Sequence, residues 1–160
     1  MLGRARQTFE PEKDGMSNLI CLASDCPDGA LVAIDLIGIA IALFLAIVFL
    51  QSGLDKVFDW KGNLDYLGQV FAKSPLAGPV APLLAVVTAA EVASGALSAL
   101  GVIGIVFFES SLLAAWGALL SAVSLLMVLF GQRLAKAYAD AAVIAPYFLV
   151  ACLGIWVLGS

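Results

Sequence analysis

The chain has 160 residues, of which 62% are hydrophobic and only 12% carry a charge. A soluble domain of this length needs more polar surface than these residues supply, so the composition indicates an integral membrane protein. The net charge is −4 and the few Lys and Arg residues are scattered, which leaves no basic patch for a nucleic acid. His is absent, and three Cys residues cannot complete a tetrahedral metal site alone. We therefore expect no metal site and no His-based catalysis.

The first 30 residues are polar and mixed in charge, and we expect them to form an N-terminal tail before a membrane domain over residues 31–160. This tail lacks the basic-then-apolar order of a signal peptide, because the acids from Glu10 onward stand where an apolar run is needed. Cys21 and Cys26 lie five positions apart, which is not the spacing of a redox pair or a zinc knuckle. We interpret them as two unrelated thiols, or as a structural disulfide if the tail faces an oxidising compartment.

Four apolar stretches reach the length needed to cross a bilayer, and they predict an all-α four-helix bundle in a membrane. The segment between the first two stretches mixes large apolar and polar residues, which is typical of an amphipathic helix at the membrane surface. A link of only three residues joins the second stretch to the third and predicts that they are antiparallel neighbours. The expected bounds of the four spans are 34–54, 82–108, 112–131 and 141–158.

Small residues recur every three or four positions along the first three stretches, and they predict where the helices approach most closely. The first stretch repeats them at Gly38, Ala42 and Ala46. In the fourth stretch, we expect Cys152 to fill space between helices as a small apolar residue. Five glycines are expected at helix contacts: Gly38, Gly53, Gly95, Gly101 and Gly117.

The second stretch carries one acid, Glu91, about a third of the way along. An ionised carboxylate at that depth costs several kcal/mol unless it is protonated, paired or hydrated, so its side chain should face other protein. Helical spacing places Thr88 and Ser98 on the same face as Glu91. Lys56, at the end of the first stretch, either extends outward to the membrane surface or turns back toward Glu91. These four residues form the candidate buried polar site, for which a proton site and a packing clasp are the two interpretations.

Two serines of the third stretch, Ser121 and Ser124, are candidate donors to the Glu91 carboxyl if the two helices align. The alternative is that each hydroxyl bonds the backbone of its own helix.

Lys and Arg residues near the spans fall in the first and third loops, at Lys56, Lys61, Lys73, Arg133 and Lys136. The positive-inside rule then places these two loops in the cytoplasm and both termini outside. The opposite orientation has in its favour that the N-terminal tail need not be translocated.

Residues 52–56 (SGLDK), followed after a proline-rich loop by residues 91–101 (EVASGALSALG), resemble the DoxX family. Members are small proteins of four membrane helices, with Ser-Gly-x-x-Lys near the end of the first helix and Glu-x-x-x-Gly-x-Leu-x-x-x-Gly in the second. The likeness covers roughly residues 38–104, and the last two spans match only by pattern. Asp35 and Glu109 stand where the resemblance implies basic residues.

The resemblance implies an association with membrane redox systems, thiosulfate–quinone oxidoreductase subunits and oxidative-stress complexes. We expect an accessory or assembly subunit of a larger membrane electron-transfer complex, without catalytic residues or a cofactor of its own, in the bacterial inner membrane. Its expected partners are other membrane subunits and the lipid bilayer. One alternative is a quinone- or thiol-linked redox subunit in which Glu91 accepts a proton and Lys56 is its charge partner. The other is a small transporter or proton path that uses Glu91.

Overall fold

The computed structural model describes the backbone of residues 27–159 and the side chains of residues 34–159. The predicted tail, with Cys21 and Cys26, lies almost wholly outside these residues. The chain divides into two compact units, Met1–Ile34 and Asp35–Ser160, and the bundle described below is formed by the second. The described residues form five helices and no strand: α2 (Pro27–Phe58), α3 (Trp60–Phe71), α4 (Val80–Phe108), α5 (Leu112–Leu134) and α6 (Tyr138–Leu158).

Four of the described helices, namely α2 from Ile34 onward, α4, α5 and α6, are long and apolar enough to cross a membrane. The shortest, α6, has 21 residues and is therefore about 32 Å long, close to the thickness of a bilayer core. The predicted all-α four-helix bundle is confirmed, and the chain is a multi-pass integral membrane protein.

The helices extend beyond the apolar stretches that predicted them. Helix α2 begins at Pro27, inside the segment expected to be tail, and ends at Phe58 rather than at residue 54. Helix α5 continues to Leu134 and α6 begins at Tyr138, so the loop between them is only three residues long. Apolarity marks where a helix meets lipid, whereas the backbone hydrogen bonds of the helix can continue into the polar layers. Hydropathy alone therefore underestimates helix length.

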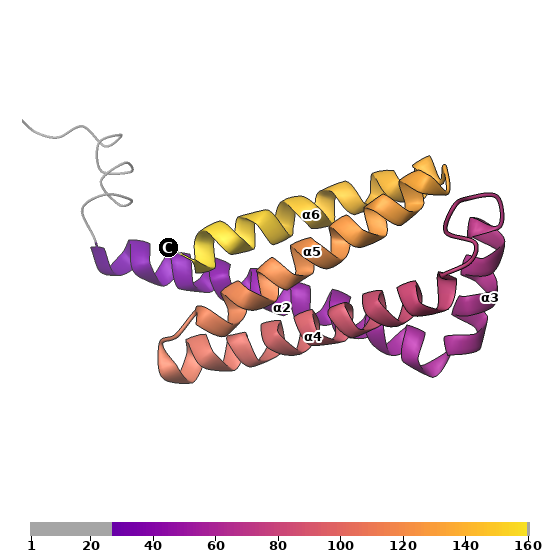
Figure 1. Ribbon diagram of the computed structural model, residues 1–160. Helices are drawn as coiled ribbons and strands as arrows, with labels where there is room; N and C mark the ends of the chain where they lie inside the picture. The colour runs from indigo at the N-terminus through magenta and orange to yellow at the C-terminus, as the bar shows by residue number, and fades with distance from the viewer. Residues whose placement is uncertain (1–26, 160) are drawn as a thin grey trace, which may run out of the picture. The chain divides into compact units, whose positions relative to one another are not determined.

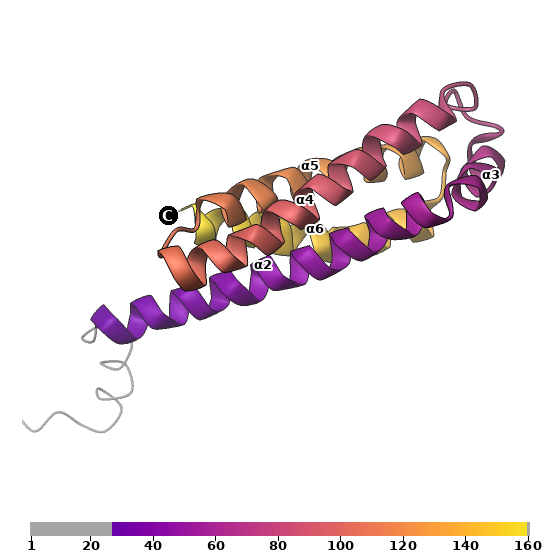
Figure 2. The same ribbon diagram turned by 90° about the horizontal axis from the view of Figure 1, so that it is seen from below.

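The four long helices of the second unit lie side by side, each antiparallel to the next along the chain (Figure 1). Figure 2 shows α2 running along both α4 and α6, which closes the bundle. Helix α3 lies across one end, where α2 ends and α4 begins (Figure 1). The Asp59 side chain accepts a hydrogen bond from the Gly62 N–H (3.1 Å) and so caps α3. The buried ring of Phe71 lies beside Gly131 of α5 and attaches the other end of α3 to the bundle.

Small residues contribute much of the bundle interior, and many large apolar residues face outward. Ala42, Ala114, Ala118 and Ala151 are fully buried together with a few larger side chains such as Leu45, whereas many other large apolar side chains of the spans are exposed. Lipid is as apolar as a leucine side chain, so burying large residues brings little gain in a membrane, and close backbone approach favours small ones. Cys152 was predicted to fill space between helices, and this is wrong, because it is exposed on the outer face of α6.

The five glycines expected at helix contacts all lie at such contacts. A Cβ atom built on Gly95 of α4 would stand 2.7 Å from the backbone nitrogen of Leu50 in α2. One built on Gly117 of α5 would stand 2.7 Å from the backbone nitrogen of Ser98 in α4. No side chain fits in these gaps, so both positions let two backbones touch. The other three face neighbouring helices in the same way: Gly38 against Leu158, Gly53 against Val92, and Gly101 against Ala114.

A sixth contact glycine, Gly154 of α6, was missed by the sequence analysis. Its added Cβ would stand 2.9 Å from Ile41 Cγ2 of α2 and 3.2 Å from Ala118 Cβ of α5. Ala151, three positions before it, is also buried, but the next residues at spacings of three and four, Tyr147, Phe148, Val157 and Leu158, are all large, so the small pair does not extend into a longer repeat.

Candidate functional site

The candidate site is organised around an ion pair between α2 and α4. Lys56 Nζ donates to Glu91 Oε2 at 2.8 Å. The Glu91 side chain is only 6% exposed and that of Lys56 is 20% exposed. In the structure, Lys56 therefore turns back toward Glu91 and does not extend outward to the membrane surface. The pair compensates the charge that Glu91 would otherwise bring unpaired into the membrane.

Ser52 completes this cluster from one helical turn before Lys56. Lys56 Nζ donates to Ser52 Oγ at 2.8 Å and to the Ser52 carbonyl oxygen at 3.2 Å, so all three ammonium protons have acceptors. Ser52 Oγ in turn donates to Glu91 Oε2 at 3.3 Å. Ser52 begins the Ser-Gly-x-x-Lys motif but was not predicted to be a site residue, although its spacing of four from Lys56 places both on one face of α2.

Gly53 explains why the two charged helices come within reach of each other. A Cβ atom on Gly53 would stand 2.6 Å from Val92 Cγ2, and Val92 directly follows Glu91. Any larger residue at this position would push α4 away from α2 at the level of the pair. Residues 52–56 and 91–101, which carry the family resemblance, are thus in direct contact.

Thr88 and Ser98 share the buried face of α4 with Glu91 but make no hydrogen bond to it. Thr88 Oγ1 donates to the Leu84 carbonyl of its own helix at 2.7 Å. Ser98 Oγ is fully buried and has no hydrogen-bond partner among the described residues. Of the four predicted site residues, the structure brings only Glu91 and Lys56 together.

Ser121 and Ser124 of α5 also do not reach Glu91. Both hydroxyls are fully buried and neither has a hydrogen-bond partner in the described part of the chain. The expectation that one of them donates to Glu91, or bonds its own backbone, is therefore wrong in both forms. Glu91 Oε2 is instead held by α2, which Gly53 and Gly95 bring close.

A cavity of about 410 Å³, open on one side, lies against this cluster. Residues of every described helix contribute to its wall, from α2 to α6. Its lining combines six aliphatic and aromatic residues with eight polar or charged ones, so it offers a small molecule both apolar surface and hydrogen-bonding groups. The polar and charged lining residues are Ser52, Lys56, Tyr66, Glu91, Ser124, Gln132, Asp140 and Tyr147.

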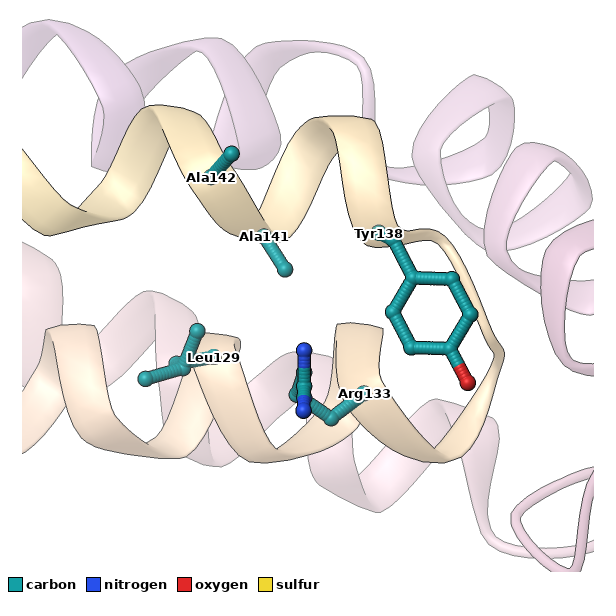
Figure 3. Close-up of a pocket in the computed structure, with 5 residues that line it drawn as sticks. All are labelled: Leu129, Arg133, Tyr138, Ala141 and Ala142. Carbon is teal, nitrogen blue, oxygen red and sulfur yellow. The ribbon is translucent and has the colours of Figure 1, made fainter.

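A second hollow, of about 400 Å³, lies at the turn between α5 and α6 (Figure 3). The Arg133 guanidinium lies 5.1 Å from the centroid of the Tyr138 ring, a cation–π contact that joins the two helix ends. Both residues are exposed, and the rest of the lining is Leu129, Ala141 and Ala142. This hollow contains no buried polar group, so the cavity beside Glu91 is the candidate site.

Among the described residues, no three His, Cys, Asp or Glu side chains gather where a metal ion could bind. Comparison with protein families, curated proteins and solved structures found no match. The resemblance to the DoxX family therefore remains an expectation from the sequence, based chiefly on the motifs at residues 52–56 and 91–101.

Proposed function

We propose that this chain is an accessory or assembly subunit of a larger electron-transfer complex in the bacterial inner membrane, respiratory or of a related energy-converting type. The observation that carries the proposal is the Lys56–Glu91 pair, because the buried charges are already used to hold α2 against α4. A pair that joins two helices contributes to assembly of the bundle, and it engages the Lys56 amine and the Glu91 carboxylate with each other.

The link to electron transfer comes from the resemblance of residues 52–56 and 91–101 to the DoxX family. The direct contact between these two segments supports it, since Ser52, Lys56 and Glu91 form one hydrogen-bonded cluster. In this proposal the redox groups belong to partner subunits, and this chain supplies membrane-embedded surface and a cavity.

A second candidate function is a quinone-linked redox subunit in which Glu91 accepts a proton. One observation favours it: Glu91 and Lys56 both line the 410 Å³ cavity, so a ligand there would contact the charged pair directly. The thiol-linked form and the transporter have no comparable support in the described residues.

The test is extraction of the full chain from native membranes with a mild detergent, followed by a native gel and mass identification of the proteins that migrate with it. We expect subunits that carry haem, flavin or iron–sulfur groups. Migration of the chain alone, or only with copies of itself, would overturn the proposal.

The Glu91→Gln variant separates the two candidates within the same experiment. If Glu91 only holds helices, complex that still assembles should turn over at the wild-type rate. If Glu91 accepts a proton, assembled complex should lose turnover, because an amide cannot take up the proton. Lys61→Met on the exposed face of α3 is the control that changes a charge elsewhere.

A further inference from the structure

We propose that the cavity beside Glu91 binds a lipophilic molecule whose head group donates hydroxyl hydrogen bonds, of the alkylated hydroquinone type. The proposal concerns the cavity itself and holds whether or not the chain has a redox partner. It is carried by hydrogen-bonding atoms at the cavity that no described residue satisfies.

Two of these atoms are acceptors. Glu91 Oε2 receives the hydrogen bonds from Lys56 and Ser52, whereas Oε1 of the same carboxylate receives none from the described residues. Gln132 Oε1, near the end of α5, is buried without a hydrogen bond. Both residues line the cavity. A buried acceptor without a donor is costly, so Gln132 Oε1 favours a ligand that carries O–H or N–H groups, and Glu91 Oε1 offers such a ligand a second acceptor.

Ser124 supplies a third unsatisfied group. Its hydroxyl is fully buried, lines the cavity and has no partner among the described residues. Ser124 and Gln132 are eight residues apart on α5, which separates their backbones by about 12 Å along the helix axis. The long Gln132 side chain can reach back toward the N-terminal end of α5, so a ring with hydroxyls at opposite ends can span the remaining gap.

Because of the Lys56–Glu91 pair, the cavity favours a ligand that donates hydrogen bonds over one that accepts them. All three protons of Lys56 are already used, by Glu91 and twice by Ser52. The charged groups left for a ligand at the cavity are therefore carboxylates, those of Glu91 and Asp140, which attract a hydroxyl and repel a carbonyl or ether oxygen. A site of this kind discriminates against analogues that lack the hydroxyl.

The rest of the wall suits an apolar ring and tail. Phe49, Val128 and Ile144 contribute aromatic and aliphatic surface, and a volume of about 410 Å³ accommodates one substituted ring. Val143 of α6 also lines the cavity although it is 59% exposed. Since α6 spans the membrane, the cavity is open on a side that faces lipid. A ligand can therefore enter from the bilayer and leave its tail there.

The test measures binding of 2-decylhydroquinone and of its 1,4-dimethyl ether to the purified full chain in detergent, by isothermal titration calorimetry under anaerobic conditions. The two probes share ring and tail, so they partition similarly into micelles and differ at the site in their donors. We expect the hydroquinone to bind at least about tenfold more tightly than the ether. Equal binding of the two probes, or saturable binding of neither, would overturn the proposal.

Variants of the cavity residues test whether the hydroquinone binds in this cavity. Ser124→Ala should weaken hydroquinone binding about three- to tenfold. Ser121→Ala removes an equally buried and unpartnered hydroxyl that does not line the cavity, and it should leave the affinity unchanged. Gln132→Met should weaken binding, whereas Gln132→Glu keeps the acceptor and should retain it. Equal effects of Ser124→Ala and Ser121→Ala would show that the cavity does not hold the probe.

Discussion

At the scale of single residues, Lys56 and Glu91 explain each other's position. The sequence predicts that Glu91 faces protein, because a carboxylate inside a bilayer needs a partner. It leaves the direction of Lys56 open, since a lysine near a helix end can also reach the membrane surface. The outcome depends on Gly53, which lets α4 come close enough for the 2.8 Å contact. That distance depends on how the two helices pack together, so it cannot be predicted from either stretch of sequence alone.

Lys56→Met should leave the Glu91 carboxylate buried without its cation and lower the free energy of unfolding by about 3 kcal/mol. The double variant Lys56→Met, Glu91→Met removes both charges and should recover most of this loss. Unfolding in mixed detergent micelles, followed by circular dichroism, measures both. Lys61→Met on the exposed face of α3 is the control and should change stability by less than about 0.5 kcal/mol. A double variant that loses as much stability as Lys56→Met and Glu91→Met added together would contradict the ion pair.

At the scale of helices, the contact faces were largely predictable and the helix ends were not. Small residues repeated at three or four positions mark the inner face of a membrane helix, and Ala42, Ala114 and Gly117 are all buried as this pattern requires. Gly154 was not predicted because it forms only a single small pair with Ala151, which is shorter than the repeats in the first three spans. The helix ends were not predicted because hydropathy reports the lipid boundary, whereas α2 continues to Phe58 through hydrogen bonds of its own backbone.

Gly117→Ala tests close packing between α5 and α4. The new methyl group would stand 2.7 Å from the Ser98 backbone nitrogen, so the helices must separate, at a cost of about 1–3 kcal/mol. Gly68→Ala in α3 is the matched control, because no atom lies within 4 Å of its added Cβ. It should instead stabilise the protein by about 0.5–1 kcal/mol through helix propensity. Unfolding midpoints that move in the same direction for both variants would contradict the close contact.

Glu109 ends α4 in a left-handed conformation, with φ of 51°. The Ser110 N–H donates to the Gly104 carbonyl at 3.1 Å, which closes the turn into α5. A side chain in this conformation costs about 1–2 kcal/mol, so Glu109→Gly should raise the free energy of unfolding by about 0.5–1 kcal/mol. Ser110→Gly next to it, where φ is not positive, should lower it. Thermal unfolding of the two variants in detergent measures both, and a loss of stability in Glu109→Gly would refute the strain.

At the scale of the molecule, the two connections that contain Lys and Arg lie at one end of the bundle. The segment from α2 to α4, with α3, and the short turn from α5 to α6 both lie there, and the α4–α5 turn lies at the other (Figure 1). The cavity opens toward the same end, since Tyr66 of α3 and Asp140 of α6 line it. From the number of spans and the lengths of the loops, the sequence predicted that the first and third loops lie at one end of the bundle and the second loop at the other. It did not predict the cavity, because residues from all five described helices form the wall.

The common position of these basic loops makes orientation in the membrane testable. The positive-inside rule places the α3 end, with Lys61, Lys73 and Arg133, in the cytoplasm and the α4–α5 turn outside. In a variant whose native cysteines are replaced, Ser110→Cys should react with a membrane-impermeant maleimide in intact cells, because Ser110 is exposed in that turn. Lys73→Cys, equally exposed at the other end, should react only after the membrane is permeabilised. The reverse pattern would show that the α3 end faces outward, so that the Lys56–Glu91 cavity opens away from the cytoplasm.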